Sequence, residues 1–482
     1  MPYIQKYAIN QFEMTCLDEL IKETNPVRLY RLVVDKFVDS NSEKLGIKTD
    51  NYIGRPEYHP SDLLCLVLYG YINRVSSSRR LEKECHRNIE VQWLMGHLRP
   101  DHWTINNFRT SNEKLIKGLV KQFRQFLKAQ NLIDGQLVAI DGTKIKANSC
   151  RDMLNSSELR EMIHRGEEGI NKYLDELDIL DKLEDEQERL HQMQEERERL
   201  TKELEDLKAK TEEQKRLLQK AEKEKVKYLA TTDKDSRLML TRNGKVPGYN
   251  SQMAVDAKHH FIVSNTVTND AGDQHQLKPV VEDMMAEGIP VQTVVADKGY
   301  STLDDIQLIE EEKSVECVVG IVKTPKGDEE NFSYDARNDQ YICPMGKRLK
   351  LKHKANESKS EKSSVYICRE CEDCPMRESC TDSKMGRKVY RRVNQEWRDA
   401  YKERMKQEKN KKKLSHRKEV VEHVFGTIKL YMGAIPLLLR GIEKVAIEID
   451  LYVQAYNFKR LLNLFDFNDL MTKVAEFDWK MA

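Results

Sequence analysis

The stretch 291–304, VQTVVADKGYSTLD, constrains the fold more than any other part of this sequence. A short apolar run, 294–296, is followed directly by Asp297. Gly299 permits a tight turn, and Ser301 is a suitable N-cap for a helix that begins there. A buried strand that ends on a carboxylate before a glycine turn is where an α/β fold exposes reactive groups. A single such Asp is more often a solvated strand end, so the interpretation depends on matching carboxylates elsewhere.

Two other stretches supply matching carboxylates. In QLVAIDGTKIKAN, residues 137–140 indicate a buried strand, and Asp141 lies within it or at its end. In SHRKEVVEHVFGTIK, apolar residues at i, i+3, i+4 and i+7 from Val421 form one face of a helix. Lys418, Glu422 and Lys429 share the opposite side, because steps of four and seven residues return to nearly the same direction. The helix therefore presents one carboxylate flanked by two cations.

Three carboxylates on two strands and one helix are the ligands that two hard divalent cations need. Mg²⁺ prefers oxygen ligands and keeps several waters, so few protein ligands suffice. Two such ions about 4 Å apart can activate a water or a 3′-hydroxyl and stabilise the leaving oxygen in phosphoryl transfer. The pattern therefore favours metal-dependent phosphodiester chemistry.

The length and charge distribution bound the domain organisation. The chain has 482 residues, which predicts two to four domains, and its net charge is +1. Lys and Arg nevertheless crowd 387–418, whereas acidic residues concentrate in 175–206. A basic surface can therefore exist without a basic total. We find neither a signal-peptide pattern nor an apolar run long enough to cross a membrane, so we expect an intracellular protein.

The N-terminal region, 1–132, is predicted to be a helical domain. Its short helices are separated by turns and carry basic residues that include Arg79, Arg80 and Arg109. Such helices can dock on DNA in a helix-turn-helix manner. An ordinary helical domain with solvated basic residues explains the same pattern equally well.

Two insertions are expected within the rest of the chain. Residues 155–231 are rich in Glu, Lys, Leu, Gln and Arg, and we expect a long helix or a helical hairpin that either dimerises or folds back on itself. Residues 325–410 contain a cysteine cluster in a basic, polar context. Cys371 and Cys374 have the spacing of a structural zinc site, and Cys343 with Cys380 can complete four thiolates. Cys368 is a spare or alternative ligand, and the competing interpretation is a set of free thiols that only pack.

The remaining segments, 133–154, 232–324 and 411–468, are predicted to form the catalytic core. Their expected order is a strand with an Asp, a two-stranded hairpin, a helix, a strand with an Asp, a helix, a strand, and a helix with a Glu. That is the element order of a ribonuclease-H-like α/β fold. The predicted architecture is this core with a helical N-terminal domain, a coiled-coil-like helical insertion and a Cys-rich insertion.

These motifs resemble the DDE triad of bacterial insertion-sequence transposases with a ribonuclease-H-like core. The resemblance rests on AIDGTKIKAN, VVADKGYST and VVEHVFGTIK, and on further stretches such as GYNSQMAVDAKHHFIVSNTVTND and CPMG with CEDCPMRESC. It implies that Asp141, Asp297 and Glu422 hold two Mg²⁺ ions, with Mn²⁺ as a substitute. It also implies binding of double-stranded DNA, cleavage at the element ends and strand transfer into a target, by a homodimer or higher oligomer in the bacterial cytoplasm at the nucleoid.

The resemblance also concerns the residues around the Glu. It implies that Lys429 contacts the DNA backbone near the cut. Related transposases often carry a Tyr and an Arg at fixed spacings before the Glu, where this chain has Ser415 and Lys418. Arg417 lies one residue from the expected position, so Lys418 is the expected replacement for the Arg. The role of the Tyr, and with it any hairpin-type intermediate, is in doubt.

Three other functions share some of these residues. A transposase-derived DNA-binding protein that has lost catalysis would be expected to show a damaged triad, whereas all three carboxylates are present. A coiled-coil scaffold would leave the strand-Asp pattern and the cysteine cluster unexplained. A nuclease without strand transfer would share every residue named above.

Overall fold

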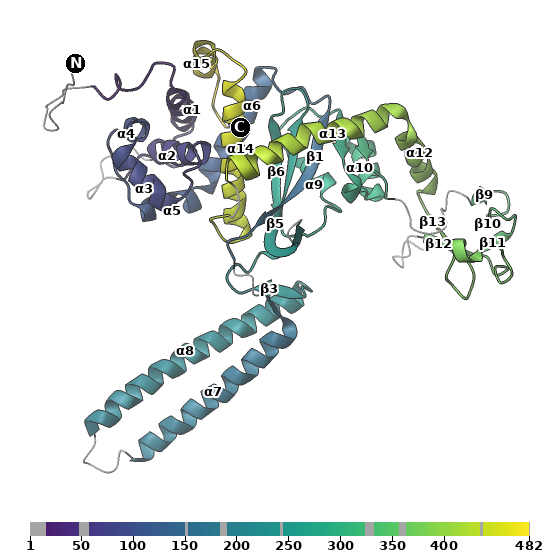
Figure 1. The fold of residues 1–482 in the computed structure, drawn as a ribbon, viewed down its shortest axis with the longest axis horizontal. Coiled ribbons are helices and arrows are strands. Elements are labelled where there is room, and N and C mark those ends of the chain that lie inside the picture. Colours follow the sequence, from purple (N-terminus) through teal and green to yellow (C-terminus); the bar gives the residue numbers. More distant parts are fainter. Residues whose placement is uncertain are drawn as a thin grey trace, which may run out of the picture.

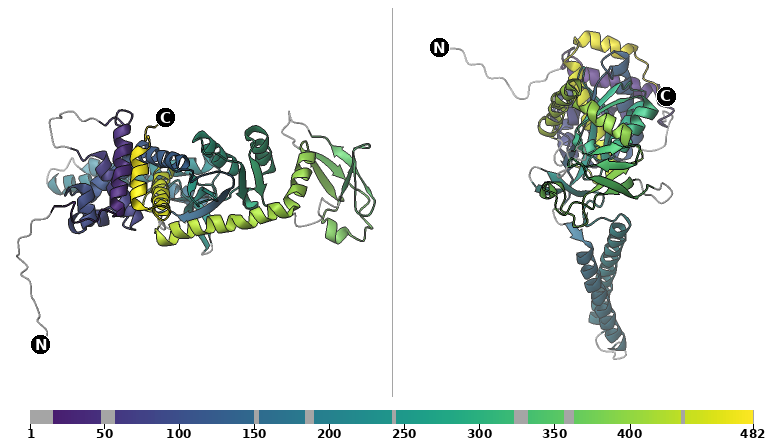
Figure 2. Two further views of the ribbon diagram at one scale, coloured as in Figure 1. Left: turned by 90° about the horizontal axis from the view of Figure 1, so that it is seen from above. Right: turned by 90° about the vertical axis from the view of Figure 1, so that its right-hand side faces the viewer.

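The computed structural model is a mixed α/β structure, and it describes residues 16–47, 57–149, 153–183, 190–241, 244–322, 332–355, 363–433 and 437–481. A central sheet is packed between helices, a long helical hairpin projects from one side, and a small second sheet lies at the end of a long helix (Figure 1). In Figure 2 the view from above shows the small sheet apart from the central sheet, and the side view shows the helical hairpin projecting away from the rest.

The N-terminal part is helical, as the sequence predicts. Asn25 caps the first helix by accepting a hydrogen bond from the Val27 N–H, and Pro60 occupies the first turn of the second. The second helix is buried almost all round, because it packs against the other N-terminal helices and against a C-terminal helix. The helices are α1 (Pro26–Ser40), α2 (Pro60–Ile72), α3 (Ser78–Arg87), α4 (Ile89–Met95), α5 (His102–Ser111) and α6 (Glu113–Ala129).

The central sheet contains both antiparallel and parallel strands. Its order is β4-β5-β1-β7-β8, and β6 also pairs with β5. β1 and β5 are antiparallel, as are β5 and β6, whereas β1, β7 and β8 are parallel. The strands are β1 (Val138–Lys146), β4 (Arg237–Thr241), β5 (Gly244–Asp256), β6 (Ile262–Thr268), β7 (Thr293–Ala296) and β8 (Glu316–Val319).

Helices connect the parallel strands and cover the sheet. α9 (Leu277–Ala286) and α10 (Leu303–Lys313) pack against each other and against strands β6 and β8 respectively. α13 (Glu408–Gly426) contacts β1, β7 and β8, and Figure 1 shows it crossing the sheet. α14 (Ile442–Leu462) contacts β6, α2 and α6, so it joins the sheet to the N-terminal helices.

The C-terminal helix α14 differs from its prediction. The sequence indicates an amphipathic helix with Lys459 and Arg460 exposed. In the structure most of its residues are buried, since the sheet lies on one side and the N-terminal helices on the other. Arg460 is half-buried and donates from Nε to the His259 carbonyl at 2.7 Å. The shorter elements of this region are α12 (Gln395–Lys406), a π-helical turn η4 (Thr427–Tyr431) and α15 (Phe467–Glu476).

The first insertion is a helical hairpin that folds back on itself. α7 (Ser156–Leu183) and α8 (Leu190–Lys223) lie side by side, and the short strands β2 (Met153–Asn155) and β3 (Tyr228–Ala230) pair at its base (Figure 1). Leu200, Leu204 and Leu217 of α8 are buried. The heptad-like leucines thus pack within the chain, which is one of the two alternatives that the sequence leaves open.

The described residues of the segment expected to form the second insertion make a small antiparallel sheet of order β13-β12-β11-β10-β9. Its separate core has few buried side chains, among them Tyr341, Leu349, Tyr366 and Val389. The elements are β9 (Ser333–Asp335), β10 (Gln340–Ile342), β11 (Arg348–His353), β12 (Ser363–Ile367), α11 (Arg377–Cys380) and β13 (Lys388–Arg392).

Two boundaries near the site differ from the sequence prediction. The helix after Asp297 begins at Leu303 with Thr302 as its N-cap, not at Ser301, because a 3-10 turn η1 (Lys298–Tyr300) intervenes. The apolar stretch 316–322 predicts a longer strand, whereas β8 ends at Val319. None of the helices in the described ranges combines the length and apolar character that a membrane span requires.

Candidate active site

Asp141 and Asp297 lie side by side in the central sheet. The parallel register pairs Ile140 of β1 with Ala296 of β7, and each Asp is the next residue along its strand. β7 ends at Ala296, whereas β1 continues to Lys146, so β1 extends past the end of β7 from Asp141 onward. The two aspartates are therefore neighbours at the point where β7 ends and β1 continues, and both are half-buried.

The Asp141 carboxylate is held by an arginine from α13. Arg417 Nη1 lies 2.7 Å from Asp141 Oδ2, and the Gly142 N–H donates to Asp141 Oδ1 at 2.9 Å. Burial raises the pKa of Asp141; Arg417 opposes this shift, and the nearby Asp297 adds to it. Two neighbouring, half-buried carboxylates repel each other, and a cation bound between them would relieve that repulsion.

Asp297 is fixed by the turn that follows it. Its Oδ1 accepts from the Gly299 N–H at 2.7 Å, and the residue is the N-cap of the 3-10 turn. Tyr300 at the end of this turn is buried, and burial together with three nearby aspartates, including Asp297, raises the pKa of its phenol. The turn predicted after Gly299 thus serves to orient the carboxylate as well as to reverse the chain.

α13 places Arg417, rather than Lys418, at the two aspartates. Arg417 is buried and faces the sheet together with Val421 and Val424, whereas Lys418 is exposed. Steps of four and seven residues keep Arg417 in line with the two valines, while Lys418 is turned about 100° away. Arg417, one residue from the expected position, is therefore the basic residue of α13 that reaches Asp141, and the phosphate contact expected of Lys418 stays a prediction.

Glu422 and Lys429 lie beyond Arg417 in the same helical segment. Glu422 is exposed, as its position opposite the valines predicts. Lys429 lies in η4, and its Nζ donates to the Lys144 carbonyl of β1 at 3.0 Å. Lys429 therefore reaches the free edge of β1, three residues past Asp141.

The donor set at the site suits a hard cation, although the carboxylates are not gathered into a three-ligand cluster. Across the described ranges, no three His, Cys, Asp or Glu side chains lie close enough to hold a metal ion. Asp141 and Asp297 nevertheless suffice for one ion, since Mg²⁺ is often bound through one or two carboxylates and several waters. We conclude that these two residues fit a divalent cation.

Asp273 is a site residue that the sequence analysis missed. It lies in the segment NDAGDQHQ before α9, which was interpreted only as the start of a helix. Its Oδ1 accepts from Lys144 Nζ at 2.9 Å, Asn250 Nδ2 at 2.8 Å and Gln252 Nε2 at 3.0 Å. An acidic residue in a polar loop carries no local signal of such contacts, because its partners come from β1 and β5.

The N-terminal candidates for DNA contact divide into exposed and buried residues. Arg79 and Arg80 of α3 are exposed. Arg109 of α5 is only 3% exposed, and its guanidinium donates to the Tyr71 hydroxyl, the Ser76 carbonyl and Asn106 Oδ1. The prediction that Arg109 contacts DNA is therefore wrong for this structure, since the guanidinium ties α5 to the preceding helices.

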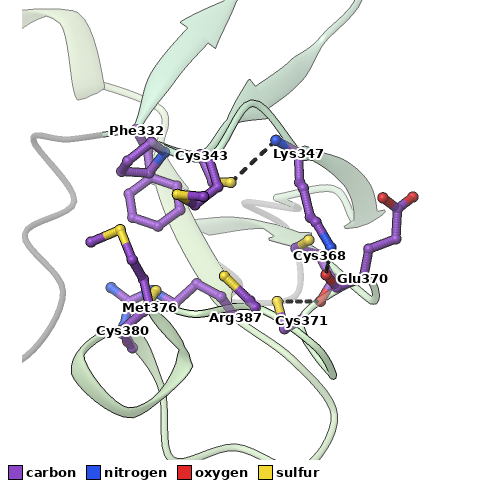
Figure 3. Close-up of a pocket in the computed structure, with 12 residues that line it drawn as sticks. Phe332, Cys343, Lys347, Cys368, Glu370, Cys371, Met376, Cys380 and Arg387 are labelled. Carbon is purple, nitrogen blue, oxygen red and sulfur yellow. Dashed lines mark hydrogen bonds between the residues drawn. The ribbon is translucent and has the colours of Figure 1, made fainter.

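The cysteines of the second insertion line one pocket (Figure 3). Cys343 lies in the turn after β10, and its Sγ accepts from the Lys347 N–H at 3.2 Å. Cys371 and Cys374 share a turn before α11, and Cys380 ends that helix. Burial and the neighbouring thiols Cys371, Cys374 and Cys343 raise the pKa of Cys380, which places the four thiols near one another.

Cys368 also lines this pocket, and it is the most deeply buried of the cluster. Burial raises its pKa to about 11. The five thiols surround the pocket, but they are not drawn together to metal-binding distances within the described residues. The other cysteines are scattered, mostly in apolar settings that predict packing; Cys65, Cys85 and Cys317 are buried, whereas Cys16 is exposed. Cys150, also predicted to pack, lies outside the described residues.

The fold and the paired aspartates do not by themselves assign a class of protein, and comparison with known families supplies one. A family described as "Transposase DDE domain" matches residues 342–462, and one described as "Transposase domain (DUF772)" matches residues 15–111. The two matches together cover less than half of the chain, and both indicate a DDE transposase of the insertion-sequence type. No curated protein and no solved structure matched the chain.

Proposed function

We propose that this protein binds the ends of an insertion sequence, cleaves DNA by metal-dependent phosphodiester hydrolysis and transfers the strands to target DNA. The observation that carries the proposal is the register of β1 and β7, which brings Asp141 and Asp297 together at a step in the sheet. The two transposase family matches, on either side of β1 and β7 in the sequence, support the same function.

The catalytic core is proposed to be ribonuclease-H-like. Support comes from the strand order, in which an antiparallel meander of β1, β5 and β6 is extended by parallel strands β7 and β8 beside β1. The helical hairpin and the small sheet would then be insertions into this core. The proposed limits are 133–154, 232–324 and 411–468, with 1–132 as the DNA-binding region.

The proposed cofactor is a pair of Mg²⁺ ions, for which Mn²⁺ can substitute. Asp141 and Asp297 would hold them, and Glu422 on α13 is the proposed third ligand. Bound ions of this kind activate an attacking water or 3′-hydroxyl and stabilise the leaving oxygen. The chain itself orients the carboxylates, through Arg417 for Asp141 and through the Gly299 N–H for Asp297.

The proposed partner is double-stranded DNA, at both the element ends and the target. The exposed residues Arg79, Arg80 and Lys418 are proposed to contact phosphates, together with Lys429 near the cut. Binding through such contacts weakens steeply as salt is raised, because each one releases counterions. We further propose that the protein acts as a homodimer or higher oligomer on DNA, in the bacterial cytoplasm at the nucleoid.

A structural zinc ion is proposed for the second insertion. The thiols around one pocket are donors of the kind that Zn²⁺ prefers, and Cys343 Sγ accepts a backbone N–H there. The separate core of this sheet is small, and domains of that size usually need a metal or disulfides. The proposed ligands are Cys343, Cys371, Cys374 and Cys380, with Cys368 as the alternative.

Zinc content measured on purified protein tests that assignment. We expect about one zinc per chain, lost in Cys371→Ser and retained in the control Cys16→Ser, whose thiol is exposed outside the pocket. Protein that is free of zinc after expression in zinc-supplemented medium, yet folded, would show that the thiols only pack.

A cleavage and joining assay tests the catalytic proposal. Purified protein is mixed with a labelled fragment carrying the element's own ends, in Mg²⁺ and in EDTA. Cuts at the ends should require Mg²⁺ and should be lost in Asp297→Ala, while DNA binding persists. Asp270→Asn is the control, since this exposed acid lies outside the site. Joined products separate a transposase from a plain nuclease, and binding without cutting in Mg²⁺ or Mn²⁺ would refute the catalytic proposal.

A further inference from the structure

A polar network centred on Asp273 lies on the face of β1 opposite to Asp141. Alternation along the strand places Gly142 and Lys144 on this face, and the register pairs them with Gln252 and Asn250 of β5. The Asp273 carboxylate accepts hydrogen bonds from Lys144, Asn250 and Gln252, all on Oδ1 and all at 3.0 Å or less. The Asp273 carboxylate, which lies in a loop, thus binds one side chain of β1 and two of β5.

Two glycines next to the candidate aspartates leave the space that the Asp273 carboxylate occupies. A Cβ added at Gly142 would stand 2.5 Å from Asp273 Oδ1, so a side chain at this position would displace the Asp273 carboxylate. A Cβ at Gly299 would stand 3.5 Å from Asp273 Oδ2. Asp273 therefore lies between the residue after Asp141 and the turn after Asp297.

The partners of Asp273 are themselves fixed. Asn250 and Gln252 are fully buried, and the Tyr300 hydroxyl donates to Gln252 Oε1. Burial alone would raise the pKa of Asp273, but the hydrogen bonds from Lys144, Asn250 and Gln252 outweigh it and lower the pKa. The carboxylate is therefore ionised at neutral pH and its orientation is set by several donors, which distinguishes it from a surface ion pair.

Lys144 is held at two points by this arrangement. Its carbonyl accepts from Lys429 Nζ, and its own Nζ donates to Asp273. The Lys144 side chain is 18% exposed. Its ammonium has three N–H groups, and one of them donates to Asp273. Asp273 in turn lies near the Asp297 carboxylate, since a Cβ at Gly299 would stand 3.5 Å from Asp273 Oδ2 and 2.9 Å from Asp297 Oδ1. A cation fixed in this way at the turn after Asp297 is suited to bind a phosphate oxygen brought to the site.

We propose that Lys144 contacts a DNA phosphate at the cleavage site, and that Asp273 is the positioning residue that orients Lys144. The inference rests on the proposed function, because it assumes that this site cleaves DNA. Lys429 then supports the same strand edge from the other side by binding the Lys144 carbonyl. Neither Lys144 nor Asp273 belongs to the carboxylate triad.

The test is a double-mutant cycle with Lys144→Met and Asp273→Asn, using full-length protein and the labelled end fragment in Mg²⁺. Loss of one charge-assisted contact predicts that Lys144→Met lowers kcat/KM about 10- to 100-fold. The slope of log affinity against log salt should become shallower by about one. Asp273→Asn should lower kcat/KM about 10-fold with an unchanged slope, because the lysine charge remains.

The decisive result is the double variant. If Asp273 acts only through Lys144, adding Asp273→Asn to Lys144→Met should change kcat/KM by less than about twofold. Lys278→Met on the neighbouring α9 is the matched control and should behave as the unmodified protein. Multiplying effects in the double variant would refute the positioning role, and an unchanged salt slope in Lys144→Met would refute the phosphate contact.

Failure of the proposed function and failure of the Lys144 inference give different results. If the unmodified protein does not cut in Mg²⁺, the proposed function fails. If it cuts and both single variants cut equally well, only this inference fails. Should Asp273→Asn prove unfolded by its melting curve, the cleavage rate and salt slope of Lys144→Met still decide whether Lys144 contacts DNA.

Discussion

A buried carboxylate on α14 links the sheet to the N-terminal helices, and its ionisation should destabilise the chain. Asp450 accepts from Asn265 Nδ2 of β6 at 2.7 Å. Burial raises its pKa from 3.8 to about 6, and the Asn265 bond and the Arg124 and Lys117 charges only partly oppose this. Arg124 is itself paired with Glu287 at 3.0 Å, so it does not depend on Asp450.

The sign and size of the effect follow from the two pKa values. The pKa of Asp450 is higher in the folded than in the unfolded protein. The carboxyl therefore costs no unfolding free energy while it is protonated in both states, and unfolding free energy is lost as pH rises through about 6. The loss amounts to about 3 kcal/mol at pH 7.5 and about 1 kcal/mol at pH 4.5. Asp450→Asn removes this loss but buries an amide N–H that needs an acceptor, at a cost of about 1 kcal/mol.

Thermal unfolding of Asp450→Asn at the two pH values measures the effect. We expect the variant to be about 2 kcal/mol more stable than the unmodified protein at pH 7.5 and about equal to it at pH 4.5. That corresponds to a rise in Tm of several degrees at pH 7.5 only. Asp469→Asn on the exposed side of α15 is the control and should show no such difference. A stability change that is independent of pH would refute the reasoning.

Three further substitutions test how the parts are held together. Gly135→Ala should lower the free energy of unfolding, measured with denaturant, by about 3–5 kcal/mol. The reason is that φ of residue 135 is +63° and the added Cβ would stand 1.7 Å from the Pro290 carbonyl oxygen. Leu204→Ala should cost about 2–3 kcal/mol in the helical hairpin, seen as faster amide hydrogen exchange in α7 and α8 alone. Asn457→Leu should lower the free energy of unfolding by about 2–5 kcal/mol, because the Ile262 N–H and C=O both lose their buried hydrogen-bond partner. An unchanged Tm in calorimetry would contradict this expectation.

The sequence by itself determined the order of the elements and the position of the paired aspartates. Apolar runs before Asp141 and Asp297 are local patterns, and the strands they predict are β1 and β7. The hairpin of β5 and β6 and the helical character of 156–223 are equally local. The 3-10 turn after Asp297 was missed, since Ser301 is a good N-cap by propensity but the turn extends first to Tyr300.

Tertiary structure alone decided which side chains surround the aspartates. Arg417 was chosen over Lys418 by one step of about 100° on α13, which depends on the face that packs on the sheet. Arg109 is buried because Tyr71 and Ser76 come from other elements. Asp273 contacts β1 and β5 from a loop more than twenty residues away in sequence from Asn250. Such contacts depend on the register and packing of distant segments, and no local pattern of residues encodes them.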